Sequence, residues 1–301
     1  MPDIRARAAY LAYRAGAEVA RAVPRAPGEV LARGISRGMT RIWSTRRRQV
    51  ERHLERAAGR RLTGEELRQA TAAVFDNYAR YWHEFFRLPE DAPGGLEDHM
   101  DSEGFEHIEA GAARGRGTIL ALPHLGNWDF AGAWLAGRGF RLTVVAEPLD
   151  PPDLFEWFVG FRRQLGMEVV PLGPQAAGQA LRALGENRVV CLLCDRDLSG
   201  DGVAVDFFGE TTTLPGGAAT LALRSGAPLL PVGTYFRGQG RHLARILPPV
   251  PAQRTGRLRD DVERVTQELA YRFEELIRAA PEQWLLMQPN WPSDHGEGAA
   301  S

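Results

Sequence analysis

The chain has 301 residues, 44% of them hydrophobic, so it can bury a large core in one or two domains. Its formal net charge of −1 argues against a strongly basic nucleic-acid-binding protein and against a disordered acidic chain. The charge is uneven, however, because residues 1–61 contain 15 arginines and five acidic residues. This basic segment indicates either an anionic partner, such as a membrane surface or a nucleic acid, or a solvated helical surface.

Residues 1–61 are predicted to be helical, with a break near 23–28. The stretch over 6–23 is interrupted by Arg14, Glu18 and Arg21, so it is too polar for a membrane span and lacks the apolar centre of a signal peptide. Its pattern favours an amphipathic helix on a membrane surface, where arginines face lipid phosphates and apolar side chains enter the boundary. Packing of the same helix on its own domain is the alternative.

Further along the chain, an amphipathic helix is predicted over 64–88, with Phe75, Tyr78, Trp82 and Phe86 on one face. This aromatic face is expected in the core, and a groove for an apolar chain is the alternative. Apolar runs then predict strands over 118–123, 141–147, 168–172, 189–195 and 228–236, with helices at about 128–138, 151–165, 174–186 and 216–225. Apolar strands that alternate with helices imply an α/β fold with a mostly parallel central sheet and helices on both faces.

The last part of the chain adds a predicted edge strand over 242–249 and a final helix over 258–280. We therefore expect a basic helical membrane-docking segment over 1–61, an α/β domain over 62–292 and a disordered tail over 293–301.

Two cysteines, Cys191 and Cys194, fall in a predicted strand, where a spacing of three places them on opposite faces. Because no second pair completes a zinc site, we expect buried, reduced thiols and a reducing compartment.

The stretch "LPHLGNWDFAG" over 122–132 places a histidine directly after an apolar strand. Pro123 ends the strand, so His124 is expected at its carboxyl end, where open α/β sheets bind ligands. Asn127 or Asp129 is suited to cap the next helix. The Asp129 carboxylate is predicted to hold one imidazole nitrogen, so that the other acts as a base. The alternative is that Asp129 is only a cap and His124 a surface residue.

A second group of charged residues, Asp195, Arg196 and Asp197, directly follows an apolar run. Charges at this place are costly unless they are paired or functional, so we expect them at a functional site. An ion pair between Arg196 and one aspartate is the structural alternative. The stretch over 213–220 is predicted to begin a helix whose free amides bind an anion, and a simple tight turn is the alternative.

A resemblance to a known protein family covers roughly residues 60–292. It rests on the H-x4-D motif "HLGNWD" and on longer stretches over 146–173, 195–232 and 281–291. In these stretches the chain resembles the bacterial glycerophospholipid and lipid-A late acyltransferases. It is most similar to the phosphatidylinositol mannoside acyltransferases of high-G+C Gram-positive bacteria. The membrane-spanning helix of the lipid-A enzymes is not expected here, which favours the peripheral, mannoside-type branch.

The resemblance implies that a long-chain, palmitoyl-like acyl group moves from acyl-CoA to a mannose hydroxyl of a phosphatidylinositol mannoside. It assigns His124 as the general base and Asp129 as its orienting partner. Backbone amides of the turn after His124 are expected to stabilise the oxyanion. No metal ion and no cofactor is expected, because acyl-CoA serves as a co-substrate.

The resemblance also implies which residues bind substrate. Glu147 and one arginine, Arg162 or its neighbour Arg163, are expected to line the active-site groove, and arginine suits a phosphate of CoA or of the acceptor lipid. The remaining substrate-binding candidates are Asn127 and the charged group of Asp195, Arg196 and Asp197, which is expected at the sugar or CoA site.

These inferences place the protein as a peripheral enzyme on the cytoplasmic face of the plasma membrane. Its expected partners are acyl-CoA, the mannoside acceptor and an anionic membrane surface, and no nucleic acid. Three alternatives remain open: acylation of another glycolipid or a lysophospholipid, a metal-dependent phosphoesterase, and a catalytically idle membrane-docking protein. The phosphoesterase needs His124, Asp129, Asp195 and Asp197 to converge as metal ligands.

Overall fold

The computed structural model describes residues 4–92 and 95–295, and its centre is a seven-stranded sheet with the order β1-β9-β8-β2-β5-β3-β4. The strands are β1 (Met100–Glu103), β2 (Thr118–Leu122), β3 (Leu142–Ala146), β4 (Met167–Pro171), β5 (Val189–Leu193), β8 (Leu229–Phe236) and β9 (His242–Ile246). Strands β8, β2, β5, β3 and β4 run parallel, whereas β9 is antiparallel to β8 and carries β1 at the edge. The predicted α/β fold with a mostly parallel sheet is confirmed.

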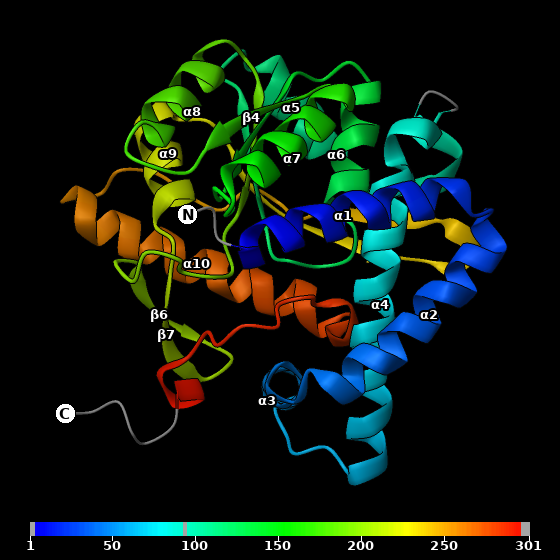
Figure 1. The fold of residues 1–301 in the computed structure, drawn as a ribbon. Helices are drawn as coiled ribbons and strands as arrows, with labels where there is room; N and C mark the ends of the chain where they lie inside the picture. The colour runs from blue at the N-terminus through cyan, green and yellow to red at the C-terminus, as the bar shows by residue number, and fades with distance from the viewer. Residues whose placement is uncertain (1–3, 93–94, 296–301) are drawn as a thin grey trace.

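In the described part of the chain, ten α-helices accompany the sheet (Figure 1). They are α1 (Ile4–Ala22), α2 (Arg25–Ile42), α3 (Ser44–Ala58), α4 (Gly64–Asp91), α5 (Glu106–Ala113), α6 (Trp128–Gly137), α7 (Pro152–Gln164), α8 (Ala176–Gly185), α9 (Gly217–Ser225) and α10 (Leu258–Arg278). Ile119 and Ala121 of β2 pack with α8, α9 and α10, whereas Leu120 and Leu122 pack with α4, α6 and α7. Side chains alternate along a strand, so a fully apolar β2 requires helices on both faces.

Most predicted elements agree with the observed ones to within two residues at their ends. The strand expected over 242–249 is confirmed as β9, which ends at Ile246, but it is not the edge strand, because β1 pairs with it and forms the edge. Strand β1 escaped prediction because three of its four residues are exposed and polar, as edge strands often are. The hairpin of β6 (Val203–Phe207) and β7 (Glu210–Leu214) and the short helix α5 were also not predicted.

Helix α4 supports both the N-terminal helices and the sheet. It begins with a capping box, in which the Thr63 hydroxyl accepts from the Glu66 N–H and the Glu66 carboxylate accepts from the Thr63 N–H. On its aromatic face Phe75 and Phe86 are buried, as expected for a core. Trp82 is half-buried and also lines the cavity beside His124 that is described below.

Helices α1 and α2 lie against α4, and α3 connects them to it (Figure 1). Ala17 and Ala20 of α1 are buried in this contact, whereas Leu11, Val30 and Ile42 remain exposed. Across residues 4–92 and 95–295, no helix has both the length and the apolar character that crossing a bilayer requires. The boundary expected at residue 61 falls in the turn between α3 and α4, although these two helices pack together.

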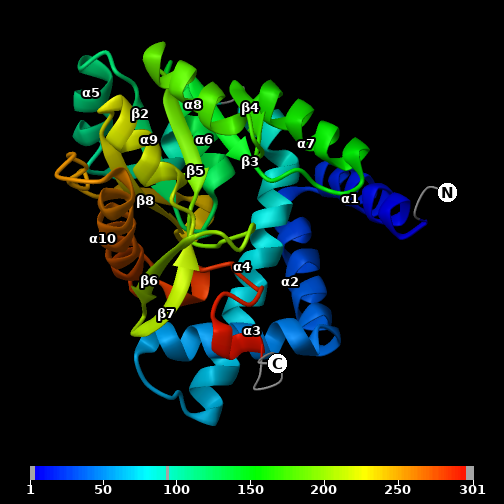
Figure 2. The same cartoon turned by 90° about the vertical axis from the view of Figure 1, so that its left-hand side faces the viewer.

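The C-terminal segment folds back onto α3 (Figure 2). A disordered tail was expected from residue 293, but Pro292–His295 forms a short 3-10 helix. The Asp294 side chain is fully buried and accepts hydrogen bonds from Arg56 and from the N–H groups of Asn290 and Trp291. The expectation is therefore wrong for residues 293–295, and residues 296–301 lie outside the described part of the chain.

Candidate active site

His124 lies on a tight turn between β2 and α6. All five residues of β2 are buried, and Pro123, which has no N–H to donate, ends the strand. Gly126 has a φ of +62°, and a Cβ there would collide with a backbone carbonyl oxygen of β8, so the turn requires glycine. Asn127 then caps α6, with its side-chain oxygen accepting the Phe130 N–H at 3.0 Å.

The His124 imidazole is held by Asp195, which follows the neighbouring strand β5. The Nδ1–H of His124 donates to Oδ1 of Asp195 at 2.6 Å, and the His124 backbone N–H donates to Oδ2 at 2.8 Å. Leu122 and Leu193, the last residues of the two strands, lie opposite each other, so the residues two positions further on meet at the carboxyl edge. Burial opposes ionisation of Asp195, yet the charge and hydrogen bonds of His124, with Trp284, hold its pKa below the ordinary value.

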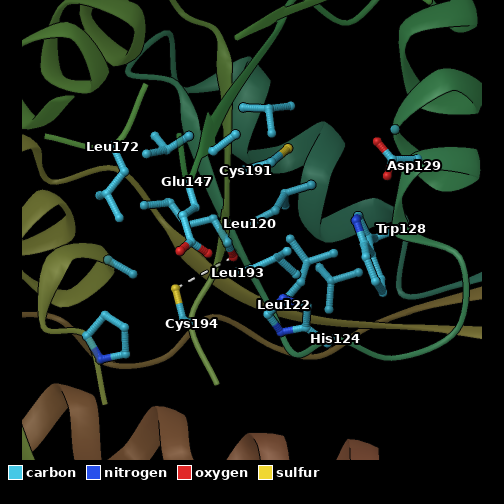
Figure 3. Close-up of a pocket in the computed structure, with 18 of the residues that line it drawn as sticks. Leu120, Leu122, His124, Trp128, Asp129, Glu147, Leu172, Cys191, Leu193 and Cys194 are labelled. Carbon is cyan, nitrogen blue, oxygen red and sulfur yellow. Dashed lines mark hydrogen bonds between the residues drawn. The ribbon is translucent and has the colours of Figure 1, made fainter. Parts of the chain in front are cut away.

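The prediction that Asp129 holds the His124 imidazole is contradicted by the contacts of Asp129. Its Oδ1 accepts from Nε of Arg162 at 2.7 Å, and its Oδ2 accepts from Nη2 of Arg162 at 3.0 Å and from the Tyr81 hydroxyl at 2.7 Å. Asp129 is the second residue of α6, and the helix carries it beyond Trp128, whose ring lies edge-on to His124 with centroids 5.4 Å apart (Figure 3). Asp129 therefore joins α6 to α4 and α7.

Of the two neighbouring arginines in α7, Arg162 faces the active site. It lines the cavity described below, whereas Arg163 is exposed and is not one of the lining residues. Burial lowers the pKa of the Arg162 guanidinium, but the Asp129 carboxylate more than offsets this and raises it above the ordinary value. Arg162 is consequently a fixed cation whose hydrogen bonds are directed at Asp129.

A cavity of about 470 Å³ opens beside His124 and runs along the sheet beneath α6 and α7. Along β3 it extends from Glu147 at the carboxyl end to Leu142 at the amino end, which corresponds to about 17 Å at the usual rise per strand residue. Its wall is largely apolar and includes Leu120, Leu122, Cys191 and Leu193 (Figure 3). A long, narrow and apolar space of this kind is suited to a hydrocarbon chain.

Polar residues collect where the cavity opens at the carboxyl ends of β3 and β5. Glu147, Arg196 and Asp197 line this region. Within residues 4–92 and 95–295, no hydrogen bond or ion pair engages the Arg196 guanidinium, so the alternative of an ion pair with a neighbouring aspartate is not realised there. Asp197 instead accepts the N–H groups of Gly200 and Gly202 and so fixes its own loop, and Asp195 is buried behind His124.

Asn127, a predicted substrate ligand, has no exposed surface and is used within the fold. Besides capping α6, it donates from Nδ2 to Oε2 of Glu84 in α4 at 2.8 Å. This contact ties the turn that carries His124 to the long helix α4. Asn127 therefore positions the turn rather than contacting a substrate.

The backbone amides expected to stabilise an oxyanion are already bonded. The Leu125 N–H donates to the Pro123 carbonyl at 2.7 Å, and the Gly126 N–H donates to the Gln283 carbonyl at 2.9 Å. The start of α9 also borders the cavity, because its lining includes Gly217 and the next residue. The predicted helix start over 213–220 is confirmed, and its first N–H groups have no intrahelical acceptor.

The metal-ligand set that the phosphoesterase alternative needs is not assembled. Asp195 is bonded to His124, Asp129 is bonded to Arg162, and Asp197 is bonded to its own loop. Over the described ranges, no group of three or more histidine, cysteine, aspartate or glutamate side chains has a geometry that could hold a metal ion.

Both cysteines are free thiols that also line the cavity. Cys194 packs into the core on the α9 and α10 face, while Cys191 packs on the α6 and α7 face, which confirms the predicted opposite orientation. Burial raises the pKa of the Cys191 thiol to about 12 and also raises that of Cys194. Both sulfurs are therefore protonated and unreactive at neutral pH.

The prediction missed three residues that shape this site. Tyr81 bonds to Asp129, Trp284 donates to Oδ2 of Asp195 at 2.8 Å, and Asn290 donates to the Asp195 carbonyl at 2.8 Å. Trp284 and Asn290 belong to the stretch "PEQWLLMQPNW", which the resemblance had already singled out. A buried tryptophan needs an acceptor for its N–H, so Trp284 could have been expected to bond to a polar group of the site.

Comparison with known proteins gives a consistent assignment. The family described as bacterial lipid A biosynthesis acyltransferase matches residues 4–293. A phosphatidylinositol mannoside acyltransferase of Mycolicibacterium smegmatis is 39% identical over 292 residues, covering 94% of this chain and 91% of that protein. One from Mycobacterium tuberculosis (strain CDC 1551 / Oshkosh) is 43% identical over 230 residues, covering 75% and 71%. A lipid A biosynthesis acyltransferase of Haemophilus influenzae is 28% identical over 196 residues, covering 64% and 59%. The chain belongs to the bacterial lipid A biosynthesis acyltransferase family.

Proposed function

We propose that this protein transfers a long-chain, palmitoyl-like acyl group from acyl-CoA to a mannose hydroxyl of a phosphatidylinositol mannoside. The observation that carries the proposal is the His124–Asp195 pair beside a long apolar cavity. The choice of acceptor is supported by the mycobacterial relatives, whose names specify phosphatidylinositol mannoside.

In this proposal His124 is the general base. Its Nδ1 carries the proton donated to Asp195, so Nε2 has a free lone pair on the side of the ring that lines the cavity. Nε2 takes the proton of the mannose hydroxyl while the hydroxyl oxygen attacks the thioester carbonyl carbon and forms the new C–O bond. Collapse of the tetrahedral intermediate breaks the C–S bond, and the imidazolium returns its proton to the CoA thiolate. Asp195 stabilises the imidazolium between these steps.

In this proposal the two parts of the cavity hold the two parts of the donor. The apolar part along β2, β3 and β5 accommodates the acyl chain. At the mouth, the unpaired Arg196 and the first amides of α9 are suited to phosphate groups of CoA. Glu147 lines the same mouth and is available to a sugar hydroxyl of the acceptor. The scheme uses no metal ion and no cofactor.

The acceptor is a membrane lipid, and the N-terminal helices are suited to reach it from the cytoplasmic face of the plasma membrane. Exposed apolar side chains on α1 and α2 include Val30, 64% exposed, and Ile42, 78% exposed. The same helices expose the arginines Arg7, Arg14, Arg33, Arg37 and Arg41. An apolar groove of about 430 Å³ lies between α1, α2 and α4, and Trp82 lines both this groove and the active-site cavity. This combination is typical of a peripheral helix at a lipid surface.

The central experiment follows CoA release from palmitoyl-CoA, with and without a phosphatidylinositol mannoside, in the presence of EDTA. We expect acceptor-stimulated release by the wild-type protein, reduced about 10²–10⁴-fold in His124→Ala and in Asp195→Asn, as for loss of a general base or its partner. Equal release by wild type and His124→Ala contradicts the general-base role. Release that is seen only when EDTA is omitted contradicts the metal-free scheme and favours metal-dependent chemistry instead.

Parallel acceptors separate the remaining alternatives. Faster acylation of a lysophospholipid or of another glycolipid overturns the acceptor assignment but keeps the acyltransferase. Absence of release with every acceptor and donor leaves only a membrane-docking role.

Membrane association is tested by sedimentation with vesicles containing anionic lipid. Ile42→Glu on α2 is expected to weaken binding, whereas Tyr271→Glu, at an exposed position of α10, is the matched control. Equal binding of both variants contradicts docking through α2.

A further inference from the structure

Trp284 makes a contact with the catalytic pair that the proposed mechanism does not use. Its indole Nε1–H donates to Oδ2 of Asp195 at 2.8 Å, and the same oxygen accepts the backbone N–H of His124 at 2.8 Å. Oδ1 is then left for the imidazole, which donates to it at 2.6 Å. Three donors therefore hold the two oxygens, and the carboxylate cannot rotate without losing hydrogen bonds to a buried charge.

The main chain on both sides of Trp284 is bonded to the catalytic turn. The carbonyl of the preceding residue accepts the Gly126 N–H at 2.9 Å, and the N–H of the following residue donates to the His124 carbonyl at 2.7 Å. Leu125, which lies between His124 and Gly126 in the chain, faces Trp284 in an antiparallel bridge. The indole thus has a fixed position relative to His124 through the main chain, while its side chain reaches Asp195.

The face of the indole ring is also covered, by a side chain of helix α3. The His53 ring stacks on Trp284 with centroids 4.9 Å apart and an interplanar angle of 28°. His53 is 2% exposed and is itself fixed, because its Nδ1 bonds to the Leu286 carbonyl at 3.0 Å and its Nε2 bonds to Gln49 at 2.8 Å. A ring enclosed in this way has no alternative position from which its N–H could miss the carboxylate.

We propose that Trp284 is a positioning residue of the His124–Asp195 pair, whose indole N–H holds the Asp195 carboxylate in the orientation that directs Nε2 of His124 into the cavity. Trp284 is not among the residues that line the cavity, so it acts through Asp195 and not on the substrate. Its effect on turnover rests on the proposed acyl transfer, whereas its effect on the imidazole is measurable without any substrate.

Two replacements remove the N–H donor. Trp284→Phe replaces the two-ring indole by a single phenyl ring. The analogue 3-benzothienylalanine at position 284 keeps the indole shape with sulfur in place of N–H. For both we expect kcat to fall about tenfold with unchanged KM values, which is the scale of one hydrogen bond to a charged group. The pKa of His124, followed by NMR titration of the ring, is expected to rise by about half a unit, because a carboxylate with one donor fewer attracts the imidazolium more strongly.

Trp291→Phe is the matched control. Trp291 is also a buried indole, 6.3 Å from Trp284 between ring centroids, but its N–H donates to the Phe207 carbonyl at 3.2 Å. We expect a similar loss of thermal stability without a shift in the His124 pKa. The other charged groups that line the cavity with His124 are unchanged in all variants: Asp129, Glu147, Arg162, Arg196, Asp197 and Asp201.

The proposal is overturned if the folded benzothienylalanine protein keeps both kcat and the His124 pKa of the wild type. It is also overturned if Trp291→Phe shifts this pKa equally, since the effect then reflects packing alone. A wild-type protein without acyl transfer contradicts the proposed function, but the NMR titration still decides the role of Trp284.

Discussion

The Arg162 guanidinium forms two hydrogen bonds with the Asp129 carboxylate, from Nε to Oδ1 at 2.7 Å and from Nη2 to Oδ2 at 3.0 Å. The pair joins α7 to the first turn of α6, and Tyr81 of α4 adds a third donor to the carboxylate. Asp129 is 2% exposed, so neither charge is balanced mainly by water. The aspartate of the H-x4-D motif, Asp129, therefore fixes helix α6, and the histidine of the motif, His124, is held by Asp195.

Asp129→Asn is expected to destabilise the protein by about 3–5 kcal/mol, because it leaves a buried guanidinium without its counter-charge. The loss is to be measured as the free energy of unfolding in urea. The double variant Asp129→Asn with Arg162→Met removes both charges and is expected to recover part of this loss. A change below about 1 kcal/mol in the single variant contradicts a structural ion pair and is typical of an exposed one.

Arg196→Gln is expected to raise the KM for palmitoyl-CoA about tenfold with little change in kcat, because it removes a charged partner for a CoA phosphate. Arg163→Gln, at the exposed arginine of α7, is the control and is expected to leave KM unchanged. A palmitoyl-pantetheine donor, which lacks the nucleotide, tests whether the contact is with the nucleotide phosphates. Equal sensitivity of both donors to Arg196→Gln means that the arginine acts elsewhere.

Met167→Ala is expected to shift the preferred acyl-CoA toward longer chains. Met167 begins β4 opposite Leu142 of β3, at the amino end of the strands, and both line the cavity far from His124. The substitution also costs about 2–5 kcal/mol of stability, as for other buried large-to-small changes. Met287→Ala removes a methionine of similar burial from the core between α3 and α4, outside the cavity. Rates over a series of acyl-CoA lengths check the prediction, and identical profiles for the two variants would falsify it.

The contacts of Asp294 predict acid sensitivity. Burial alone raises its pKa, but the His53 ring, the Asn290 N–H and Arg56 together lower it well below the ordinary value. A carboxyl group with a lowered folded pKa stabilises the fold above its unfolded pKa, near 4, and this contribution is lost as the pH falls through the folded value. In Asp294→Asn the free energy of unfolding is therefore expected to fall less between about pH 5 and pH 2 than in the wild type. Asp153→Asn, at an exposed position, is the control, and equal slopes for wild type and Asp294→Asn contradict the prediction.

Much of the framework follows from local sequence. Continuous apolar runs, with Pro123 at the end of one and glycines in the turns, predict the parallel strands and place His124 at a carboxyl edge. Glu147 and Arg196 follow the next strands for the same reason, and the structure finds both at the mouth of the cavity. The polar strand β1 was not predicted, because four residues at an exposed edge carry no apolar pattern.

The partner of His124 was decided only by the tertiary structure. The sequence by itself determined that a histidine ends β2 and that Asp129 and Asp195 are available acids. Spacing favoured Asp129, five residues away, but the first turn of α6 directs that carboxylate toward Arg162 and Tyr81. Asp195 lies 71 residues away in the chain, and it meets the imidazole because β2 and β5 are paired in register. Which strands pair depends on how the complete sheet is buried between its helices, so the pairing of β2 with β5 cannot be predicted from a local sequence pattern.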